Sequence, residues 1–161
     1  MKFCKVRDVR SPLRAHSNDA GIDFYIPKYS EEFKVKLKEL NPRLWIDDKG
    51  IEIASGEKII IPSGIKVKVP EGYALIAYDK SGVATKKGLL LLAKVVDESY
   101  LGEVIITMVN TSKDLSILDY DSKLIQMILI PMFYDTTEEI SIDEYEKFSS
   151  ARGDGGFGST N

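Results

Sequence analysis

The stretch from residue 77 to 84 carries groups that together suit an anionic substrate. A run of strand-forming residues ends there in a turn that supplies the Lys80 ammonium, the Ser81 hydroxyl and the Gly82 amide. Backbone amides at glycine can approach an anion closely, and the hydroxyl and the cation add further donors. A serine and a glycine after a strand are common, so this stretch indicates a phosphate site only in combination with others.

A carboxylate and an aromatic ring lie close together further along the chain. Asp97 follows Ser81 by sixteen residues, and Tyr100 follows Asp97 by three, in a turn-like segment before an apolar strand. Considered alone, a turn aspartate followed by a tyrosine is more often structural than catalytic. The pair therefore becomes a candidate site only when another part of the chain supports it.

The C-terminal stretch 152–160 supplies that support. It combines one arginine, Arg152, and one phenylalanine, Phe157, with four glycines and two hydroxyl residues. A planar guanidinium suits phosphate, and successive glycine amides can form an anion-binding concavity. An unstructured polar terminus is the alternative on composition alone. The phenylalanine favours a tail that docks on another surface.

Five motifs follow one another in the order found in the trimeric dUTP pyrophosphatases, and the sequence resembles that family. They are residues 20–25, 80–84, 96–103, 123–127 and 152–160. The third motif and the tail are the most specific, and the resemblance covers about residues 12–27 and 52–161. It implies a homotrimer in which each active site takes parts from more than one chain.

The resemblance implies Mg²⁺-dependent hydrolysis of dUTP to dUMP and pyrophosphate, which keeps uracil out of DNA and supplies dUMP for dTMP synthesis. Asp97 corresponds to the residue that orients the attacking water at the α-phosphorus. Tyr100 corresponds to the ring under the deoxyribose, which leaves no room for a 2′-hydroxyl. Asp23 corresponds to an aspartate that acts on the metal through water, although a strand-edge aspartate bonded to a neighbouring turn is an equal alternative.

The resemblance also implies substrate contacts from the later motifs and from the uracil hairpin before Asp97. They are Lys80, Ser81, Gly82, Lys94, Val95, Val96, Tyr100, Gln126, Arg152, Phe157, Gly158, Ser159 and Thr160. In a closed tail, Phe157 would stack over uracil and Arg152 would hold the γ-phosphate. Gln126 could equally serve as a bridge between two strands.

Three departures from the family pattern bear on this assignment. Lys80 stands where arginine is usual, which replaces a bidentate fork by a flexible point charge. Residues 92–95, Leu-Ala-Lys-Val, lack the glycines usual in the uracil hairpin, so the backbone conformation there and the choice of base, including a modified pyrimidine, stay open. Asp121 and Ser122 replace a glycine and an aspartate before the fourth motif.

Short β-branched runs separated by turn formers predict an all-β fold, and the resemblance implies a distorted jelly roll. The predicted strands are 3–10, 20–27, 51–53, 58–61, 65–69, 73–78, 103–110 and 124–131. Residues 20–27 alternate and predict one apolar face, whereas 103–110 and 124–131 are near-continuously apolar, as expected at a trimer interface. The turn formers at 62–64 should separate two strands.

We expect one jelly-roll domain over residues 1–149 and a flexible arm over 150–161 that closes over the site. Residues 28–51 have no counterpart in the usual family pattern and are interpreted as an insertion, which could bind a protein partner. Its first half could form a helix capped at Ser30 or a strand. A capping box at 141–144 predicts a short helix before the arm.

The composition of the 161 residues is that of an ordinary globular protein, with 43% hydrophobic and 29% charged residues. The formal net charge of −3 argues against non-specific nucleic-acid binding, which needs a cationic face. The only cysteine, Cys4, and the only histidine, His16, exclude an internal disulfide and a His/Cys zinc cluster within one chain. Without a signal-like or membrane-spanning apolar run, we expect the cytoplasm, in a bacterium or a phage-infected host.

Two other functions are compatible with the motifs. A dCTP deaminase relative, alone or bifunctional, would share the jelly roll and a serine-containing second motif, but the complete C-terminal motif favours the pyrophosphatase. A regulatory binding protein could instead use nucleotide-dependent closure of the tail as a switch. Ammonia release from dCTP would identify the first of these, and loss of a partner without loss of turnover the second.

Overall fold

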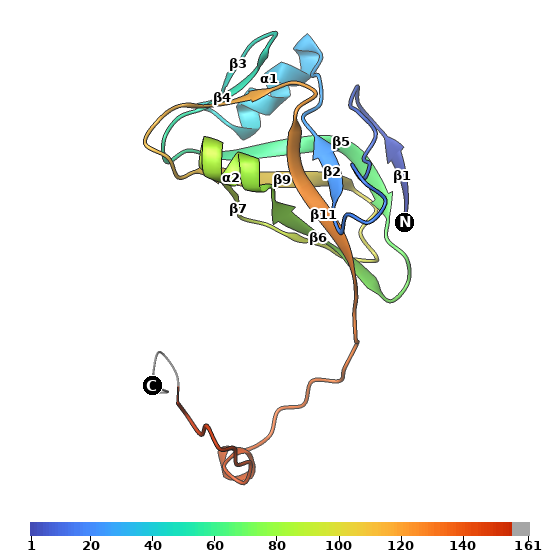
Figure 1. Cartoon of the computed structure of the whole chain (residues 1–161), viewed down its shortest axis with the longest axis vertical. Coiled ribbons are helices and arrows are strands. Elements are labelled where there is room, and N and C mark those ends of the chain that lie inside the picture. Colours follow the sequence, from blue (N-terminus) through green and yellow to red (C-terminus); the bar gives the residue numbers. More distant parts are fainter. Residues whose placement is uncertain (156–161) are drawn as a thin grey trace.

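β-strands dominate the computed structural model, which describes residues 1–155 (Figure 1). The first sheet has the order β1, β5, β9, β7, formed by Lys2–Lys5, Lys58–Lys68, Glu103–Asn110 and Leu89–Leu91. The second has the order β2, β11, β6, β8, formed by Ile22–Tyr25, Lys123–Pro131, Tyr73–Asp79 and Val95–Val96. A smaller sheet has the order β10, β4, β3, formed by Ser116–Asp119, Gly50–Ile53 and Trp45–Ile46. All of these pairs are antiparallel. Since the three sheets make up most of the fold, the predicted all-β class is confirmed.

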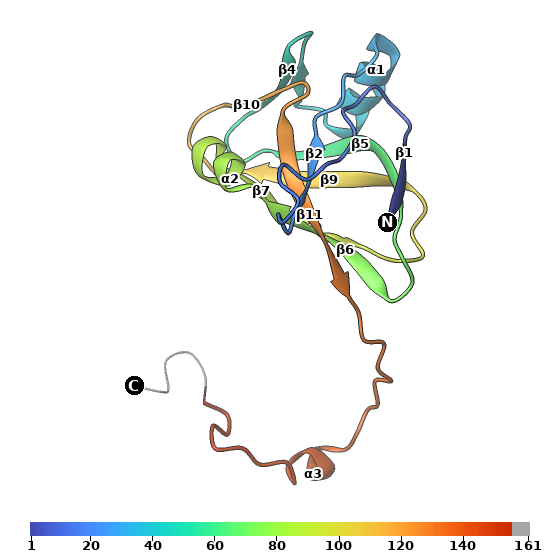
Figure 2. The ribbon, with the colours of Figure 1, turned by 45° about the vertical axis from the view of Figure 1, so that its right-hand side comes forward.

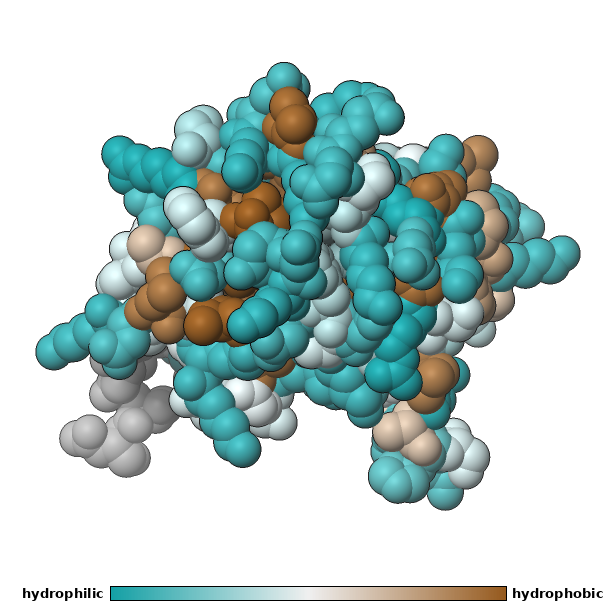
Figure 3. Space-filling model, turned by 90° about the horizontal axis from the view of Figure 1, so that it is seen from above, coloured by the Kyte–Doolittle hydropathy of each residue, from teal (hydrophilic) through white to brown (hydrophobic). Residues whose placement is uncertain are grey.

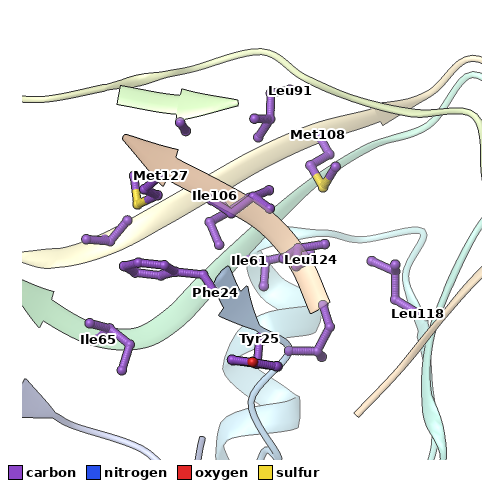
Figure 4. Packing of buried hydrophobic residues seen from close by; sticks show 14 of the residues in the cluster. Phe24, Tyr25, Ile61, Ile65, Leu91, Ile106, Met108, Leu118, Leu124 and Met127 are labelled. Carbon is purple, nitrogen blue, oxygen red and sulfur yellow. The ribbon is translucent and has the colours of Figure 1, made fainter. Parts of the chain in front are cut away.

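The main core lies between the two larger sheets. Phe24 of β2 and Met127 of β11 face Ile61 of β5 and Ile106 of β9 (Figure 4). Phe24 and Ile61 have no exposed surface, and burial of a side chain of this size stabilises the fold by about 1.5–3 kcal/mol. The core therefore fixes how the two sheets, and the loops at their ends, lie relative to each other.

Strand β5 runs without a turn through the residues predicted to interrupt it. Lys58–Lys68 forms one strand of 11 residues, with a register shift between Pro62 and Lys66. Gly64 takes a positive φ of 75° there, which glycine adopts without the steric cost of a side chain. The prediction of a turn at 62–64 is wrong because the same residues form an irregularity within a strand, where Glu103 accepts a hydrogen bond from the Gly64 amide.

The N-terminal strands also differ from the pattern read in the sequence. β1 ends at Lys5 rather than continuing to residue 10. In β2 the predicted apolar face, with Ile22 and Phe24, is buried in the core, and the other face, with Asp23 and Tyr25, is buried as well. The guanidinium of Arg10 lies 4.5 Å from the centre of the Tyr25 ring and covers it. The polar residues of this strand are therefore neutralised or covered rather than solvated.

Residues 28–51, interpreted from the sequence as an insertion, contain helix α1, which spans Glu31–Leu40, so the helical alternative is the one observed. Ser30 caps it by accepting a hydrogen bond from the Phe33 amide. At its other end, the buried Asn41 side chain donates to the carbonyls of Leu37 and Ile60 and accepts from the Ile60 amide. These bonds attach the helix to β5. The hairpin β3–β4 then completes the small sheet on this side (Figure 1).

Helix α2, Ser81–Lys87, stands where the sequence indicated only a turn. Lys80 is its N-cap residue, and Gly88 ends it in the left-handed conformation with a φ of 64°. A glycine in this position is a common way to end a helix. The short helix places Ser81 and Gly82 in its first turn, directly after β6.

After Pro131 the chain leaves the sheets, and residues 132–155 extend away from them (Figure 2). Helix α3, Ile142–Tyr145, lies in this extension, and Ser141 caps it by accepting from the Glu144 amide, which confirms the predicted short helix and its serine cap. The rings of Tyr145 and Phe148 pack edge to face, with their centres 5.9 Å apart. None of the helices in residues 1–155 has the length and apolarity needed to cross a membrane.

Candidate active site

One end of strand β6 carries a cluster of opposite charges. The ammonium of Lys80, the last residue before α2, lies 2.5 Å from Oδ1 of Asp23, and the ammonium of Lys123 lies 2.6 Å from Oδ2. Asp23 is 4% exposed, while the two lysine side chains are partly exposed. The buried carboxylate therefore holds two cations at the surface, where they can face a polyanion.

The charge of Asp23 is stabilised by these neighbours. Burial by itself raises the pKa of the carboxyl, but the hydrogen bonds and charges of Lys123 and Lys80 outweigh burial and hold the pKa below its usual value. Both oxygens already accept a hydrogen bond, and each keeps a further lone-pair direction. Asp23 thus acts here as the anchor of a cationic cluster.

Ser81 and Gly82 lie exposed in the first turn of α2. The first amides of a helix lack partners within it, and apart from the neighbouring backbone of α2 a Cβ on Gly82 would meet no atom within 4 Å. A substrate oxygen can approach the backbone here without obstruction. Of the nearby lysines, Lys87 donates instead to the Ile117 carbonyl of β10.

Gln126 of β11 bridges two neighbouring strands. Its register partners are Asp23 of β2 and Tyr78 of β6, and its amide group donates to the Asp79 carbonyl at 3.1 Å. A Cβ on Gly21 would overlap Oε1 of Gln126, so only glycine fits against this side chain. The strand-bridging role anticipated as an alternative is observed, at the same end of β6 as the charge cluster.

The hairpin that precedes the third motif is formed by ordinary backbone. Leu75 pairs with Val96 and Ile76 with Val95, and the Ala77 amide donates to the Lys94 carbonyl at 2.7 Å. Among the described residues, Asp121 is the only non-glycine with a positive φ. The segment 92–95 therefore adopts its conformation without needing the usual glycines.

The third motif and the adjoining residue Val95 line a pocket of about 200 Å³. The lining residues are Val95, Val96, Asp97, Tyr100, Val104 and Ile105. Asp97 is exposed, and its carbonyl accepts from the Tyr100 amide at 3.1 Å, which closes the turn. The Tyr100 hydroxyl donates to the Glu103 carbonyl at 2.8 Å. The carboxylate and the ring predicted as a pair are thus brought to one pocket.

Gly102 makes room for the ring of Tyr100. A Cβ at this position would overlap the Tyr100 hydroxyl oxygen, well inside any tolerable contact. Gly102 lies within the third motif, 96–103, but no role was predicted for it. A glycine two residues after the tyrosine was the available signal, because close approach is one of the few reasons to require that residue type.

Glu98 is a site neighbour that sequence reasoning missed. Its carboxylate accepts from the Gly72 amide at 2.8 Å and from the Tyr134 hydroxyl at 2.9 Å. These hydrogen bonds, that of Gly72 first, lower the pKa of Glu98. Glu98 is therefore occupied by its own chain, whereas the adjacent Asp97 carboxylate has no hydrogen bond or ion pair within residues 1–155.

The predicted site residues do not all come together within one chain. Asp97 follows Val96, the partner of Leu75, whereas the lysine cluster lies past Asp79 at the other end of β6. Those four residue steps of strand alone span about 13 Å. Arg152 lies in the extension, where its Nε donates to the Gly155 carbonyl at 2.6 Å. Four further predicted residues, Phe157, Gly158, Ser159 and Thr160, lie outside the described residues.

Within residues 1–155, no group of three or more His, Cys, Asp or Glu side chains could hold a metal ion. Mg²⁺ does not require such a group, because it keeps several waters and binds through few carboxylates together with substrate phosphates.

The comparison with protein families decides the relationship. A sequence model of the dUTPase family matches residues 48–161, well over half of the chain. The chain belongs to the dUTPase family. The predicted family and its class of enzyme are confirmed, and hydrolysis of dUTP to dUMP is the function of that family.

Relatives within the dUTPase family cover most of the chain. The deoxyuridine 5′-triphosphate nucleotidohydrolase of Mycolicibacterium gilvum is 29% identical over 160 residues, which cover 95% of this chain and 88% of the relative. The enzyme of the same name from Chlamydia pneumoniae is 31% identical over 115 residues, covering 70% of this chain and 77% of the relative.

Solved dUTPase structures share the fold. The Staphylococcus bacteriophage 80alpha dUTPase with dUPNHPP has a TM-score of 0.75 at 19% identity and covers 99% of this chain and 97% of that chain. The EIAV dUTPase has a TM-score of 0.64 at 22% identity and covers 88% of this chain and 96% of that chain. The predicted jelly roll of the dUTPase type is therefore confirmed, and trimers are typical of the family.

Proposed function

We propose that this chain hydrolyses dUTP to dUMP and pyrophosphate, with Asp97 as the base that orients the attacking water. The observation that carries the proposal is the exposed carboxylate of Asp97, which lies in one pocket with Tyr100 and strand β8, Val95–Val96. A general base must be free to accept a proton. Its neighbour Glu98 is bonded to Gly72 and Tyr134 and is unsuited to that task.

Hydrolysis of a nucleoside triphosphate requires the protein to position the reacting groups rather than to form covalent bonds with them. In the proposed mechanism, Asp97 accepts a proton from a water aligned with the α-phosphorus and also accepts from the 3′-hydroxyl. Tyr100 packs under the deoxyribose, and the backbone of 94–96 faces the base. Ser81 and the Gly82 amide donate to phosphate oxygens near the scissile bond. Each of these groups binds, orients or moves a proton.

Cations compensate for the charge of the triphosphate in a chain whose own net charge is −3. Lys80 and Lys123, already gathered by Asp23, would supply part of this compensation. Mg²⁺ would screen the rest and polarise the phosphoryl oxygens. Asp23 would reach it through water by the lone-pair directions that the lysines leave open. A mutant of the phage phi11 dUTPase, which shares the fold at a TM-score of 0.67, coordinates a structural Mg(II) ion.

We further propose a homotrimer whose sites combine different chains. The two ends of β6 lie too far apart for their groups to surround one reacting phosphate, so a second chain is needed to complete each site. The extension adds exposed aromatic side chains, with Phe133 93%, Tyr134 73% and Phe148 71% exposed. Ile105, on the outward face of β9, is 43% exposed. Burial against other chains would remove these surfaces from water.

The arm is proposed to close over a site on another chain. Arg152 would bind the γ-phosphate, Phe157 would stack on uracil, and residues 158–160, Gly-Ser-Thr, would add donors. Closure excludes water from the site before the reaction. The start of the arm at residue 150 stays a prediction, and the departure of the chain from the sheets after Pro131 gives such an arm additional reach.

The first experiment is pyrophosphate release with Mg²⁺ from dUTP, dTTP, dCTP and UTP at equal concentration. Selective turnover of dUTP would support the enzyme, the Tyr100 sugar gate and a working uracil hairpin despite the sequence of 92–95. No release from any of the four by a folded trimer would contradict the proposal. Ammonia release from dCTP would instead identify the deaminase-related reaction.

A second candidate role is binding of a protein partner through residues 28–51. Trp45 is 66% exposed and Val35 61% exposed in this segment, and a pocket of about 330 Å³ lies between α1 and the β4–β5 region. Figure 3 shows apolar side chains between hydrophilic ones on the face that carries these elements. Trp45→Ser should abolish such binding and leave turnover unchanged; unchanged binding would exclude this surface. Both roles fit a cytoplasmic protein, which we propose as its setting.

A further inference from the structure

The side chain of Glu103 accepts three hydrogen bonds, two from Arg7 and one from the Gly64 amide. Arg7 donates to it in a bidentate manner, with Nε at 2.9 Å from Oε1 and the terminal nitrogen at 2.8 Å from Oε2. The Gly64 amide of the β5 irregularity donates to Oε1 at 2.7 Å. The pair is largely shielded, with side chains 24% and 15% exposed. A bidentate pair of this kind fixes orientation as well as adding energy.

The guanidinium of Arg7 is itself fixed by the inserted segment. Its central carbon lies 3.4 Å from the centre of the Phe33 ring in helix α1. Phe33 in turn packs on the buried Tyr29, with ring centres 5.3 Å apart. A guanidinium stacked on an aromatic face loses freedom that an exposed arginine keeps. The N-terminal segment, the insertion and β9 thus meet at one ion pair.

This ion pair continues into the third motif. The backbone carbonyl of Glu103 accepts the hydrogen bond of the Tyr100 hydroxyl at 2.8 Å. On the other side, Gly102 lies directly against the Tyr100 ring and leaves no room for a side chain of its own. A shift of Glu103 would therefore move the acceptor to which the ring is bonded.

We propose that Arg7 is a positioning residue for sugar selection. Through Glu103 it holds Tyr100 where a 2′-hydroxyl is excluded, and Phe33 of the insertion holds Arg7. The inference rests on the proposed function, since it concerns the preference for dUTP over UTP at that same pocket. Small displacements of a packed ring change such a preference because selectivity depends on differential contact with one hydroxyl group.

The test compares kcat/KM for dUTP with kcat/KM for UTP in matched variants. Arg7→Met keeps a stem that can pack on Phe33 but removes the fork, and the selectivity ratio should fall about 10-fold. Arg7→Lys, which keeps the charge without the fork, should give an intermediate ratio. Arg43→Met is the control, because it breaks an Arg–Glu pair of 2.6 Å with Glu57 in the exposed part of the insertion. Its ratio should stay at the wild-type value.

A purely structural role for Arg7 makes a different prediction. It would lower thermal stability, or the rates with both nucleotides equally, and leave the ratio unchanged; that result would overturn the proposal. Glu103→Gln combined with Arg7→Met should change the logarithm of the ratio by less than the sum of the single effects, because both act through one pair. Full additivity would contradict the coupling. An unchanged ratio in Phe33→Leu would remove the insertion from it.

A readout that does not require turnover separates this inference from the proposed function. Hydrogen exchange over residues 97–104 should accelerate in Arg7→Met and not in Arg43→Met, whether or not dUTP is hydrolysed. The dissociation constant for UTP divided by that for dUTP should fall in the same variant. If wild-type protein releases no pyrophosphate, these two measurements still decide on Arg7, and unchanged exchange with an unchanged binding ratio would overturn its role.

Discussion

The carboxylates near the two ends of strand β6 have opposite environments. At one end, Asp23 is buried and bonded to Lys80 and Lys123. At the other, Asp97 is exposed, and its carboxylate makes no such bond within residues 1–155, while Glu98 beside it is bonded. The difference indicates two roles: the paired carboxylate of Asp23 holds cations, and the free carboxylate of Asp97 is available to bind water. Each variant below perturbs one end and leaves the other intact.

The largest effect is expected for Asp97→Asn. Asparagine keeps the size of the side chain but cannot take the proton, so kcat should fall by roughly 10²–10⁴-fold. Binding of dUTP should change little because the phosphate contacts remain. Single-turnover pyrophosphate release and calorimetric binding check the two parts. Asp135→Asn, another exposed carboxylate, is the control, and full turnover by Asp97→Asn would remove Asp97 from the mechanism.

Asp23→Asn should instead act mainly on stability. It leaves two ammonium groups without their shared carboxylate, and because both lysines are partly exposed the cost should be about 1–3 kcal/mol at pH 7. The pKa of Asp23 is depressed in the folded state, so its contribution is present above the unfolded pKa of about 3.9 and is lost as pH falls through the folded pKa. Urea unfolding should show the difference from wild type shrinking in that acidic range. A difference independent of pH would contradict this origin.

Two glycines extend the comparison between the ends. Gly102→Ala places a methyl group where the Tyr100 hydroxyl lies, so the ring must move and the preference for dUTP over UTP should fall about 10-fold. Gly82→Ala meets no atom of the described structure within 4 Å and keeps its amide, so the preference should not change. Kinetics with the two nucleotides measures both. Equal behaviour of the two variants would show that the close contact at Gly102 is unimportant.

The smallest effect is expected for Lys80→Arg. Arginine supplies the same charge and can still donate to Asp23, while offering a fork to phosphate. We expect kcat/KM to change by less than about threefold, with unchanged thermal stability. Lys80→Met serves as the contrasting variant because it removes the charge. A large loss in Lys80→Arg would mean that the cluster requires the compact ammonium.

The sequence predicted those features that depend on local chemistry. The strands β6, β9 and β11 and the cap at Ser141 follow from apolar runs and capping residues, and the pairing of Asp97 with Tyr100 follows from their spacing in one turn. Helix α2 was missed because seven residues between Lys80 and Gly88 carry no long periodicity. The continuity of β5 was missed because Pro62 and Gly64 form turns and strand irregularities equally well.

Contacts between distant segments lay beyond sequence reasoning. Arg7 and Glu103 are 96 residues apart, and Lys34 in α1 meets Asp48 in the following hairpin. Nothing in local periodicity relates such pairs, because only the packing of the sheets brings them together. The role of Asp23 illustrates the same limit, because the alternation of residues 20–27 does not show that Lys80, before α2, and Lys123, in β11, reach its carboxylate.

The seven residues of β6 also have a genetic consequence. If a site joins the Asp97 end of one chain to the Lys80 end of its neighbour, damage at the two ends belongs to different sites. A chain carrying Asp97→Asn and a chain carrying Ser81→Ala would each be impaired alone. When the two are mixed and reassembled, every mixed trimer would contain one site with both ends intact. Activity recovered on mixing would then measure how subunits pair, and a site built within one chain would recover none.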